Sequence, residues 1–585
     1  MRQANNYERH EEYRRWLSYL DKYLPHEAEK LKTLSEKELS LAFAGNLEFG
    51  TGGLRGIVGW GSSLINKFTI ERTTAGFAKY ISGNQSAKSV LIAYDTRRDS
   101  QAFARAAAGV MLKRNIEVYL FNAPTATPIL SYGIRKLEIG WGIIITASHN
   151  SKEYNGYKCY DARGVQLLPL PCQEIMNNIA AEAMFGIDTV PDAELETHPL
   201  FHIMGEELTD LYLEKLFKSL PNSELTLNKG NELGIVYSAL HGCGAVPVPR
   251  ILRKQGFGNC HFLQTAHDHE FGGIDTPNPE EPTVYDKAIR LARERGCKLI
   301  LTTDPDSDRT GVCICEKDTS RLLTGNQVAA LLTDYLTTVH DNTGKVLVTT
   351  VVSGEMAQAI ARARGISVYH TLTGFKYIGD LAQATPICFG YEESCGYMTS
   401  TLGGDKDGIE AAALIAEMTL YHLQQKRSLY DRWLELGEQY GYYTESQLCR
   451  CTDTNSFEQY RRHLLEKISS SPSVGNGLDR SASAESPDLS PSPHDTATPA
   501  LAIRLLEDYS EGRWYDHANN THGFLELRAE MIKILFDNGC WLAVRPSGTE
   551  NKIKYYFSAC GNTLTEAEER LAQLKTAITN TAVLQ

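Results

Sequence analysis

The sequence lacks the long hydrophobic runs of membrane-spanning and secreted proteins. A membrane-spanning helix needs roughly 18 consecutive apolar residues, and no run in this 585-residue chain comes near that length. The N-terminal stretch MRQANNYERHEEYRRWLSYL is charged and helical in pattern, without the apolar core of a secretory signal. We therefore expect a cytoplasmic protein with no membrane partner.

An excess of basic residues is also missing. Lys and Arg total 59 against 72 Asp and Glu, which gives a formal net charge of −13. Because nucleic-acid-binding proteins carry basic patches or a high pI, we expect no nucleic-acid partner. The 13 cysteines form no C-x-x-C pair, which argues against a zinc site or a disulfide framework.

Large apolar residues are nearly absent from residues 469–499, SSSPSVGNGLDRSASAESPDLSPSPHDTATP. Such a segment cannot bury enough surface to offset the entropy of ordering it, so we expect a disordered Ser/Pro-rich insertion. The whole chain, with 42% hydrophobic and 22% charged residues, has the composition of a folded protein. At roughly 150 residues per domain, its length suggests about four domains.

A weak internal repeat organises the first three quarters of the chain. Three times, an apolar run too short for a helix is followed by a helical stretch, a second run, another helical stretch and a third run. The first runs are Val90–Tyr94, Leu233–Tyr237 and Val346–Val352; the second are Glu117–Phe121, His261–Leu263 and Ile366–His370; the third are Trp141–Thr146, Lys298–Thr303 and Pro386–Gly390. This order is typical of βαβ units in parallel sheets covered on both faces.

The fold class that follows is α/β, with three similar mixed α/β domains. After about residue 437 the pattern changes to a strand-like Lys552–Ala559 and a helical Leu564–Ile578. We expect a smaller C-terminal α+β domain there, interrupted by the Ser/Pro-rich segment.

The third runs of the three units end in unusual polar loops. These loops read TASHN, TTDPDSDR and GYEES. Ligands of open α/β sheets bind beyond the carboxyl ends of the strands. The repeat therefore predicts that the three loops meet at one place.

The second loop carries Asp304, Asp306 and Asp308 at alternate positions. In an extended loop this spacing puts three carboxylates on one side, where they repel unless a cation holds them. Hard oxygen ligands suit Mg²⁺ or Ca²⁺. An EF-hand is excluded, because Arg309 and Cys315 stand where its Gly and final Glu belong. We predict a divalent metal site with Arg309 beside it, placed for a phosphate.

The first loop contains Ser148, followed by His149 and, ten residues on, Lys158. His and Lys can move protons and neutralise an anion, which is what a reactive serine needs. A serine at a strand end is also a common cap or turn former. No G-x-S-x-G elbow surrounds Ser148, so a hydrolase is disfavoured.

Three further polar stretches suit a phosphorylated sugar, although each also suits a plain turn. Glu392 and Ser394, flanked by glycines, can bond sugar hydroxyls. RPSGTE at 545–550 offers an arginine fork, hydroxyls and backbone N–H groups to a phosphate, and the chain has no Walker loop. GTGGLRG at 50–56 misses the dinucleotide fingerprint and presents Arg55 to an anion.

Taken in order, GTGGLRG, TASHNSKEYNGYK, DPDSDR, GYEESCGY and RPSGTE resemble the α-D-phosphohexomutases. Each motif alone is weak to moderate, but the ordered set is highly specific. The resemblance covers nearly the whole chain apart from the N-terminal helix and the Ser/Pro-rich segment. It implies four domains around a central cleft, three of them similar, in agreement with the repeat.

The resemblance implies a phosphoserine mechanism. Ser148 carries a phosphoryl group and passes it to a sugar monophosphate; the bound bisphosphate then turns over and returns its other phosphoryl group to Ser148. One Mg²⁺ per chain is held by Asp304, Asp306, Asp308 and a phosphoserine oxygen, and glucose 1,6-bisphosphate acts as intermediate and activator.

The resemblance also assigns roles to individual residues of this sequence. The implied catalytic residues are Ser148, His149, Lys158, Arg55 and Lys406 of GDKDG. The implied substrate-binding residues are Arg309, Thr373, Gly374 and Lys376 of TGFK, Glu392, Ser394, and Arg545, Ser547, Gly548 and Thr549 of the phosphate cradle.

The GYEES loop, which the resemblance implies is the sugar-binding loop, narrows the choice of expected substrate. Dual mannose/glucose enzymes carry GEMSGH there, whereas Cys395 and Gly396 follow the serine here and no His is present. GYEES…GY, DKDG and RPSGTENKIKYYF are similar to the branch with bacterial phosphoglucomutases and animal phosphopentomutase-like enzymes. We expect interconversion of glucose 1-phosphate and glucose 6-phosphate by an isomerase. The alternatives are turnover of pentose phosphates, synthesis of glucose 1,6-bisphosphate, turnover of mannose phosphates, and an inactive sugar-phosphate-binding protein.

The sequence also leads us to expect particular domain limits, partners and oligomeric state. The expected domains are 1–205 with the phosphoserine loop, 206–325 with the metal loop, 326–437 with the sugar loop and 438–585 with the phosphate loop, the last interrupted at 469–499. Small-molecule sugar phosphates are the expected partners, and the chain is expected to be a monomer or a weak homodimer.

Overall fold

The computed structural model describes residues 6–47, 49–50, 53–316, 319–399, 402–451, 457–470, 502–546 and 552–580. Two compact units make up the chain. The first is Met1–Thr350 with Ile360–Arg432, and the second is Val351–Ala359 with Trp433–Gln585. Of the predicted insertion, Ser469 and Ser470 end a helix, and residues 471–499 lie outside the described residues.

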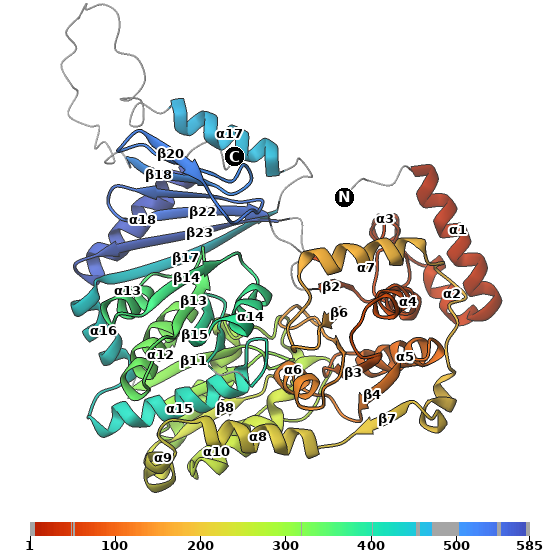
Figure 1. Ribbon diagram of the computed structural model, residues 1–585, viewed down its shortest axis with the longest axis horizontal. Coiled ribbons are helices and arrows are strands. Elements are labelled where there is room, and N and C mark those ends of the chain that lie inside the picture. Colours follow the sequence, from red (N-terminus) through yellow and green to blue (C-terminus); the bar gives the residue numbers. More distant parts are fainter. Residues whose placement is uncertain are drawn as a thin grey trace, which may run out of the picture. The chain divides into compact units, whose positions relative to one another are not determined.

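Three sheets of the first unit repeat one strand order (Figure 1). The first strand of each repeat is central, the second and third lie parallel on either side, and a fourth runs antiparallel beside the third. The strands are β3 (Ser89–Tyr94), β4 (Glu117–Phe121), β5 (Trp141–Ile145) and β6 (Tyr154–Tyr160); β8 (Ile235–Ser238), β9 (Cys260–Leu263), β10 (Leu299–Thr303) and β11 (Thr310–Glu316); β13 (Val346–Thr350), β14 (Ser367–Thr371), β15 (Ile387–Glu392) and β16 (Gly396–Met398).

All nine strands predicted from the repeat are present, most within two residues of their predicted ends. The antiparallel fourth strand was not predicted. In β6 the reason is visible, because the buried polar residues Asn155 and Lys158 interrupt the apolar pattern that marks a buried strand. The three mixed sheets confirm the α/β fold class.

Additional strands extend two of these sheets at their edges. They are β1 (Phe49–Gly50), β2 (Gly53–Ile57) and β7 (Phe201–Met204) in the first sheet and β12 (Thr319–Leu323) in the second. β2 pairs antiparallel with β6, which brings the GTGGLRG stretch to the strand that follows the serine loop.

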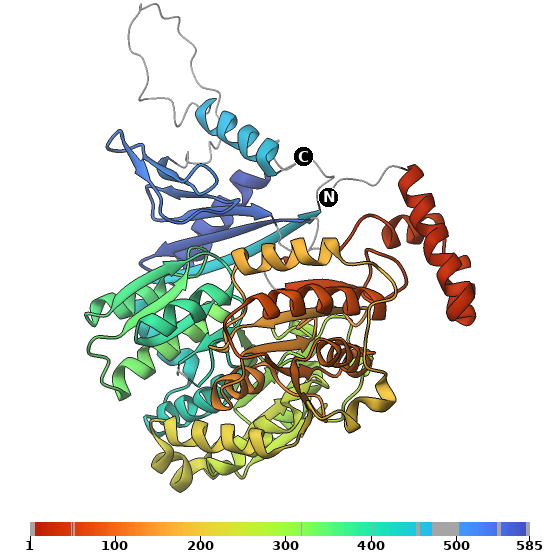
Figure 2. The same ribbon diagram turned by 45° about the vertical axis from the view of Figure 1, so that its right-hand side comes forward.

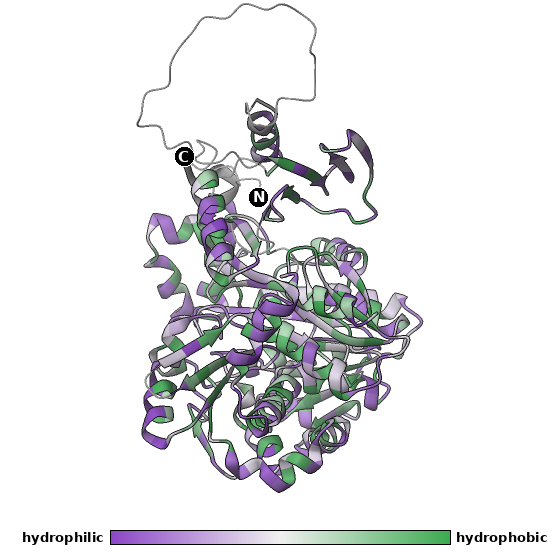
Figure 3. Cartoon of the chain, turned by 90° about the vertical axis from the view of Figure 1, so that its left-hand side faces the viewer, coloured by the Kyte–Doolittle hydropathy of each residue, from purple (hydrophilic) through white to green (hydrophobic). Residues whose placement is uncertain are grey.

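Helices bury both faces of the sheets. Every residue of β3, β5 and β10 is buried, which requires cover on both sides. Figure 3 colours the chain by hydropathy and shows green, hydrophobic segments in both strands and helices. The helices of the first unit are α1 (Asn6–Tyr23), α2 (Pro25–Lys32), α3 (Glu36–Ala42), α4 (Lys67–Gly83), α5 (Ser100–Lys113), α6 (Thr127–Lys136), α7 (Pro169–Ala181), α8 (Glu207–Ser219), α9 (Ser223–Lys229), α10 (Pro247–Lys254), α11 (Asp286–Arg295), α12 (Gly325–Val339), α14 (Phe375–Ala384) and α15 (Gly408–Gln424); α13 (Met356–Ala363) and α16 (Leu429–Tyr440) run across the limits of the two units.

The N-terminal helices have a core of their own. Trp16, Leu20, Phe43 and Phe68 belong to one hydrophobic cluster in which α1 meets the start of α4. α4 in turn packs on α7, and the two helices lie side by side in Figure 1 and in the turned view of Figure 2.

The second unit is an antiparallel sheet of seven strands covered by helices. Its strands are β17 (Tyr442–Cys451), β18 (Ile503–Asp508), β19 (Arg513–Asp516), β20 (Thr521–Phe524), β21 (Ile532–Phe536), β22 (Trp541–Pro546) and β23 (Lys552–Gly561), and its helices include α17 (Phe457–Ser470) and α18 (Leu564–Asn580). The strand and helix predicted for this region are β23 and α18, and this α+β arrangement confirms the predicted C-terminal domain.

No helix within the described ranges is both long and apolar enough to cross a membrane. The strands of the four sheets fall inside the four predicted domains. The domain limits themselves stay a prediction.

A buried carboxyl group between helices of the first unit gives stability a measurable pH dependence. Glu417 of α15 is fully buried and accepts a hydrogen bond from Tyr335 Oη of α12 at 2.8 Å, and Tyr335 Oη accepts one from Asn222 Nδ2 at 2.7 Å. Burial raises the pKa of Glu417 from 4.5 to about 7. A raised pKa in the folded state stabilises the protein at low pH, and this stabilisation is lost as the pH rises through about 7.

We expect Glu417→Gln to remove this pH dependence. Because each pKa unit corresponds to about 1.4 kcal/mol, the free energy of unfolding of E417Q relative to wild type should rise by about 2 kcal/mol between pH 5.5 and pH 8. Urea unfolding of both proteins at matched pH values measures this difference, in which all other titrating groups cancel. A difference that does not change with pH contradicts the assignment.

Candidate active site

The three polar loops predicted to meet do meet in the first unit. Ser148 Oγ, beyond β5, donates a hydrogen bond to Asp304 Oδ2, beyond β10, at 2.7 Å. Arg309 of the same second loop donates through Nη1 to the carbonyl oxygen of Ser394, beyond β15, at 3.2 Å. The backbone of Arg309 also forms an antiparallel bridge with Gly396. The loops at equivalent positions of the three repeated sheets thus contribute to one site.

Ser148 is held in an uncommon backbone conformation. It is 1% exposed and has a φ of 54°, in the left-handed region that non-glycine residues seldom adopt. Its backbone N–H donates to Thr146 Oγ1 at 2.9 Å, and its hydroxyl lies 3.4 Å from His149 Nδ1. Strained residues persist where the surroundings hold them and are frequent at functional sites.

The three aspartates are fully buried, and two of their oxygens accept no hydrogen bond from the described residues. Asp304 uses both of its oxygens: Oδ2 accepts from Ser148, and Oδ1 accepts from the backbone N–H groups of Asp308 and Arg309 at 3.2 and 3.1 Å. Asp306 Oδ1 and Asp308 Oδ1 are buried and have no hydrogen-bond partner among the described residues. One oxygen from each aspartate lies within 4.8 Å of the others.

Cations from two other elements neutralise part of this charge. Lys158 Nζ of β6 lies 2.8 Å from Asp306 Oδ2 and 3.3 Å from Asp308 Oδ2. Lys406 Nζ lies 2.8 Å from Asp308 Oδ2. Both lysines are nearly inaccessible to water. Because water screens their charges little, they attract the aspartates more strongly than exposed lysines would.

The pKa values report this balance. Burial and the other two carboxylates raise the pKa of Asp304 well above its usual value. Burial favours the neutral form of Asp306 as well, but Lys158 and Lys406 outweigh it and lower the pKa of Asp306. Burial likewise opposes the charge of Lys406, yet Asp308 and Asp405 hold its pKa above the usual range.

The donor set fits a hard divalent cation. Buried carboxylate oxygens with no partner cost free energy unless a positive charge meets them. Three aspartates with two free oxygens, beside a serine hydroxyl, match the few carboxylates plus phosphate oxygens that typically bind Mg²⁺. The predicted triad is therefore able to hold a metal ion.

The remaining predicted residues of the first unit surround this centre. Arg55 of β2 donates through Nη1 to Asn150 Oδ1 of the serine loop at 3.1 Å. Burial, followed by the nearby charge of Arg309, lowers the pKa of Arg55. Glu392 is 5% exposed and accepts the backbone N–H of Gly374 at 2.8 Å, so the TGFK and GYEES segments touch. Burial, with Glu393 beside it, raises the pKa of Glu392 to about 7.

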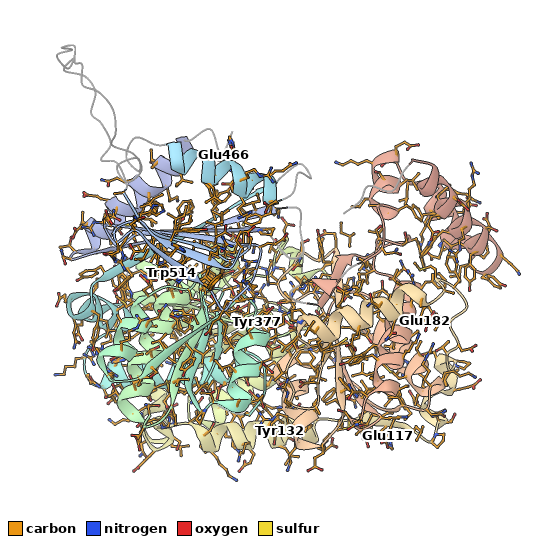
Figure 4. The ribbon with its side chains drawn as sticks, turned by 45° about the horizontal axis from the view of Figure 1, so that its top comes forward. Glu117, Tyr132, Glu182, Tyr377, Glu466 and Trp514 are labelled. Atoms are coloured by element: carbon orange, nitrogen blue, oxygen red, sulfur yellow. The ribbon has the colours of Figure 1, made fainter. Side chains whose placement is uncertain are left out.

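Lys376 lies at the start of α14 and is 4% exposed. Its ammonium group lies 5.5 Å from the ring of Tyr377, the residue labelled on this helix in Figure 4. Burial lowers the pKa of Lys376. Thr373 is half-buried beside Gly374.

The predicted phosphate cradle belongs to the second unit. Arg545 is the last residue but one of β22 and donates through Nη2 to Tyr556 Oη at 2.9 Å. Its Nε is buried without a hydrogen-bond partner among the described residues. Ser547, Gly548 and Thr549 lie outside the described residues.

Two side chains at the site were not predicted. Thr127, at the start of α6, donates through Oγ1 to Asp306 Oδ2 at 2.9 Å, and its backbone N–H donates to the carbonyl of Asp306 at 2.9 Å. Arg97 contacts the serine loop from behind. Both residues follow the carboxyl ends of parallel strands, β4 and β3, and this position is the signal that could have identified them.

Hydrogen bonds from two buried tyrosines hold the segment that carries Lys406. Tyr160 Oη donates to Asp405 Oδ2 at 2.8 Å, and Tyr212 Oη of α8 donates to Asp407 Oδ2 at 2.6 Å. Tyr212 packs edge to face on Tyr132, labelled in Figure 4, at 5.6 Å between ring centroids. The aspartates on either side of Lys406 are thus both bonded to buried tyrosines.

Four family models match the chain in sequence order. They describe domains I, II and III (alpha/beta/alpha) and the C-terminal domain of phosphoglucomutase/phosphomannomutase, and they match residues 46–184, 210–317, 324–440 and 507–576, respectively.

Relatives and solved structures agree with these models. A phosphoglucomutase of Staphylococcus haemolyticus is 32% identical, covering 93% of this chain and 95% of its own length; one of Staphylococcus aureus MRSA252 is 29% identical, covering 92% and 93%. The open form of the Paramecium phosphoglucomutase pp63/parafusin shares the fold with a TM-score of 0.68 at 16% identity, covering 91% of this chain and 94% of the other. A phosphoglucomutase/phosphomannomutase family protein of Burkholderia thailandensis has a TM-score of 0.63 at 16% identity, covering 91% and 96%.

The effect of removing the Asp304 carboxylate on the unfolding temperature should depend on whether a divalent metal ion is present. Without divalent cations, Asp304→Asn relieves like-charge repulsion, so D304N should unfold at the same temperature as wild type or higher. Excess Mg²⁺ should raise the unfolding temperature of wild type through binding to the native state, and should raise that of D304N much less. Differential scanning calorimetry with chelator and with Mg²⁺ measures both effects.

Asp188→Asn, at an exposed carboxylate, is the matched control and should follow wild type in both conditions. An equal Mg²⁺-dependent rise in D304N and wild type contradicts the metal site.

Proposed function

The chain belongs to the phosphoglucomutase/phosphomannomutase family of α-D-phosphohexomutases, and we propose that it interconverts glucose 1-phosphate and glucose 6-phosphate. One observation carries this proposal: the hydroxyl of Ser148 is bonded at 2.7 Å to a carboxylate of the buried aspartate triad. A nucleophile beside a cation site is the arrangement that phosphoryl transfer requires. The phosphoglucomutase relatives favour glucose as the sugar.

In the proposed reaction Ser148 exchanges phosphoryl groups with the sugar. The phosphoryl group leaves phosphorylated Ser148 for the free hydroxyl of the monophosphate, whose proton passes to a basic group of the site, and Ser148 Oγ is released. After the bisphosphate has turned over in the site, Ser148 Oγ attacks its other phosphoryl group, the bond from that phosphorus to the sugar oxygen breaks, and this oxygen takes the proton back from the basic group. Mg²⁺, one per chain, would be held by Asp304, Asp306, Asp308 and the phosphoserine and would neutralise charge on the transferring group.

The surrounding side chains serve proton transfer and charge neutralisation. His149 Nδ1 lies 3.4 Å from the Ser148 hydroxyl. Lys158 and Lys406 hold the aspartates in place, and one of these three groups takes the proton of the sugar hydroxyl. Arg55 steadies the serine loop through Asn150 and adds a positive charge for the transferring group.

The two ends of the substrate meet different loops. We assign the sugar hydroxyls to Glu392 and Ser394, with Arg309, Thr373, Gly374 and Lys376 beside them. The pairing of Gly374 with Glu392 supports joint action of two of these segments. We assign the non-reacting phosphate to Arg545, Ser547, Gly548 and Thr549. The unsatisfied Arg545 Nε supports an anion there.

The proposal extends to the setting of the enzyme. Glucose 1,6-bisphosphate is the intermediate and activator, sugar phosphates are the partners, and the chain works in the cytoplasm as a monomer or weak homodimer. The four domains are 1–205, 206–325, 326–437 and 438–585; the position of one sheet within each supports this division.

Initial rates on a matched substrate panel test the proposed function. The purified protein, with Mg²⁺ and a trace of glucose 1,6-bisphosphate, is offered glucose 1-phosphate, mannose 1-phosphate and ribose 1-phosphate. Glucose 1-phosphate should lead by at least about tenfold, which is about 1.4 kcal/mol of transition-state discrimination. A lead by ribose or mannose 1-phosphate changes the substrate while leaving the mechanism, and no turnover of any of them overturns the proposal.

Ser148→Ala should abolish the phosphoenzyme. We expect S148A to lose more than about 1,000-fold in kcat, because no other hydroxyl replaces a nucleophile that acts as part of a unit. Mass spectrometry should find one phosphoryl group on wild type after incubation with glucose 1,6-bisphosphate and none on S148A. Ser151→Ala, in the same loop, is the control and should keep both the phosphoryl group and most activity. Retained turnover in S148A excludes a phosphoserine mechanism.

A further inference from the structure

The guanidinium group of Arg97 is buried and donates hydrogen bonds to four carbonyl groups of the serine loop. Arg97 Nη2 donates to the carbonyl oxygen of Ser148 at 2.6 Å and to that of Asn150. Arg97 Nη1 donates to the carbonyl oxygens of Ser151 and Tyr154 at 2.7 and 3.0 Å. All four N–H bonds of the two terminal nitrogens therefore end on one turn of backbone. A lysine could not reproduce this, because it lacks the planar fork.

The guanidinium is itself fixed from two sides. Arg97 Nε lies 3.2 Å from Asp95 Oδ2, and Asp95 Oδ1 accepts from the backbone N–H of Arg97 and from Ser100 Oγ at 3.0 and 2.7 Å. The ring of Phe271, which is fully buried, lies 5.1 Å from the centre of the guanidinium. The Arg97 side chain is 1% exposed, so water cannot compete for its hydrogen bonds.

We call these four hydrogen bonds from Arg97 to loop carbonyl groups the clamp. The clamp counteracts the backbone strain at Ser148. A left-handed φ at a non-glycine residue such as Ser148 is strained, and the loop adopts it only if other contacts hold it there. Charge-assisted hydrogen bonds from a buried guanidinium are among the strongest that a loop can receive. The clamp also turns four carbonyl dipoles toward Arg97, where their negative ends meet a positive charge.

We propose that Arg97 is a positioning residue that sets the conformation of Ser148 and so the direction of its Oγ toward Asp304. Arg97 bonds to the loop backbone and pairs with Asp95, so it acts on Ser148 through the backbone, whereas Arg55 touches the side chain of Asn150. The inference rests on the proposed function, because a misdirected Oγ matters only if Ser148 receives a phosphoryl group.

Substitution of Arg97 by lysine, which keeps the charge and loses the fork, tests the proposal in the full-length chain. A displacement of about 1 Å at a reacting atom can cost about 100-fold in rate. We expect Arg97→Lys to lower kcat by about 100-fold while KM stays within about threefold of wild type, because the sugar-binding loops are untouched. The rate at which Ser148 gains phosphate from glucose 1,6-bisphosphate, followed by mass spectrometry, should fall in parallel.

Hydrogen exchange provides a readout that does not depend on activity. In R97K the amides of residues 146–156 should exchange faster, and those of β3 and β10 should exchange as in wild type. The matched control is Arg98→Lys: Arg98 is the next residue, its side chain is 59% exposed, and it pairs with Glu270. R98K should keep wild-type kcat, phosphorylation rate and exchange.

The outcomes separate this inference from the proposed function. If the wild type turns over substrate and R97K has the same kcat, the inference is overturned and the proposed function stands. The same holds if R97K differs from the wild type only by a higher KM. Absence of wild-type turnover overturns the proposed function and the inference with it. If R97K does not fold, Asp95→Asn, which removes the charge facing Nε, replaces it: a fall of about tenfold in kcat at constant KM supports the inference, and an unchanged kcat overturns it.

Discussion

Mutual repulsion among three buried carboxylates is the constraint on which the site depends. Moving an ionised carboxylate out of water costs several kcal/mol in real proteins, and Asp304, Asp306 and Asp308 are all fully buried. Lys158 and Lys406 come from separate elements to meet this charge. Thr127 adds a hydrogen bond from a third element. The aspartate loop therefore links three parts of the first unit, and the two oxygens that accept no hydrogen bond from the described residues are available to a cation.

Repetition of one sheet topology brings the chemistry together. β5, β10 and β15 hold the same place in three sheets, each between a parallel and an antiparallel neighbour, so the loops beyond them leave the sheets at equivalent points. One repeat contributes Ser148, the proposed nucleophile, the next the three aspartates able to hold a metal ion, and the third Glu392, which we propose binds the sugar. Arg309 joins the second and third loops through the carbonyl of Ser394, and the Ser148–Asp304 bond joins the first and second.

Much of this was predictable because its signals are local. An apolar run followed by a polar loop predicts a strand end wherever it occurs, and three such patterns predicted the three central strands of each repeat and the meeting of their loops. The antiparallel fourth strand of the first repeat, β6, was not predicted because buried polar residues such as Lys158 replace apolar ones there. Arg97 and Thr127 escaped because each is a single polar residue whose partner is distant in sequence, 51 residues away for Arg97 and Ser148 and 179 for Thr127 and Asp306.

By itself the sequence determined the order of the strands, the loops that carry the chemistry and the oxygen donors of the metal site, because residue type and spacing carry that information. Only the tertiary structure decided which aspartate oxygens stay free, which lysine meets which carboxylate, and that one guanidinium holds four carbonyls of the serine loop. These features depend on distances between segments far apart in the chain, and hydrogen bonds act only within about 3 Å. No local pattern encodes such distances, so the fold had to be known before Arg97 could be linked to Ser148.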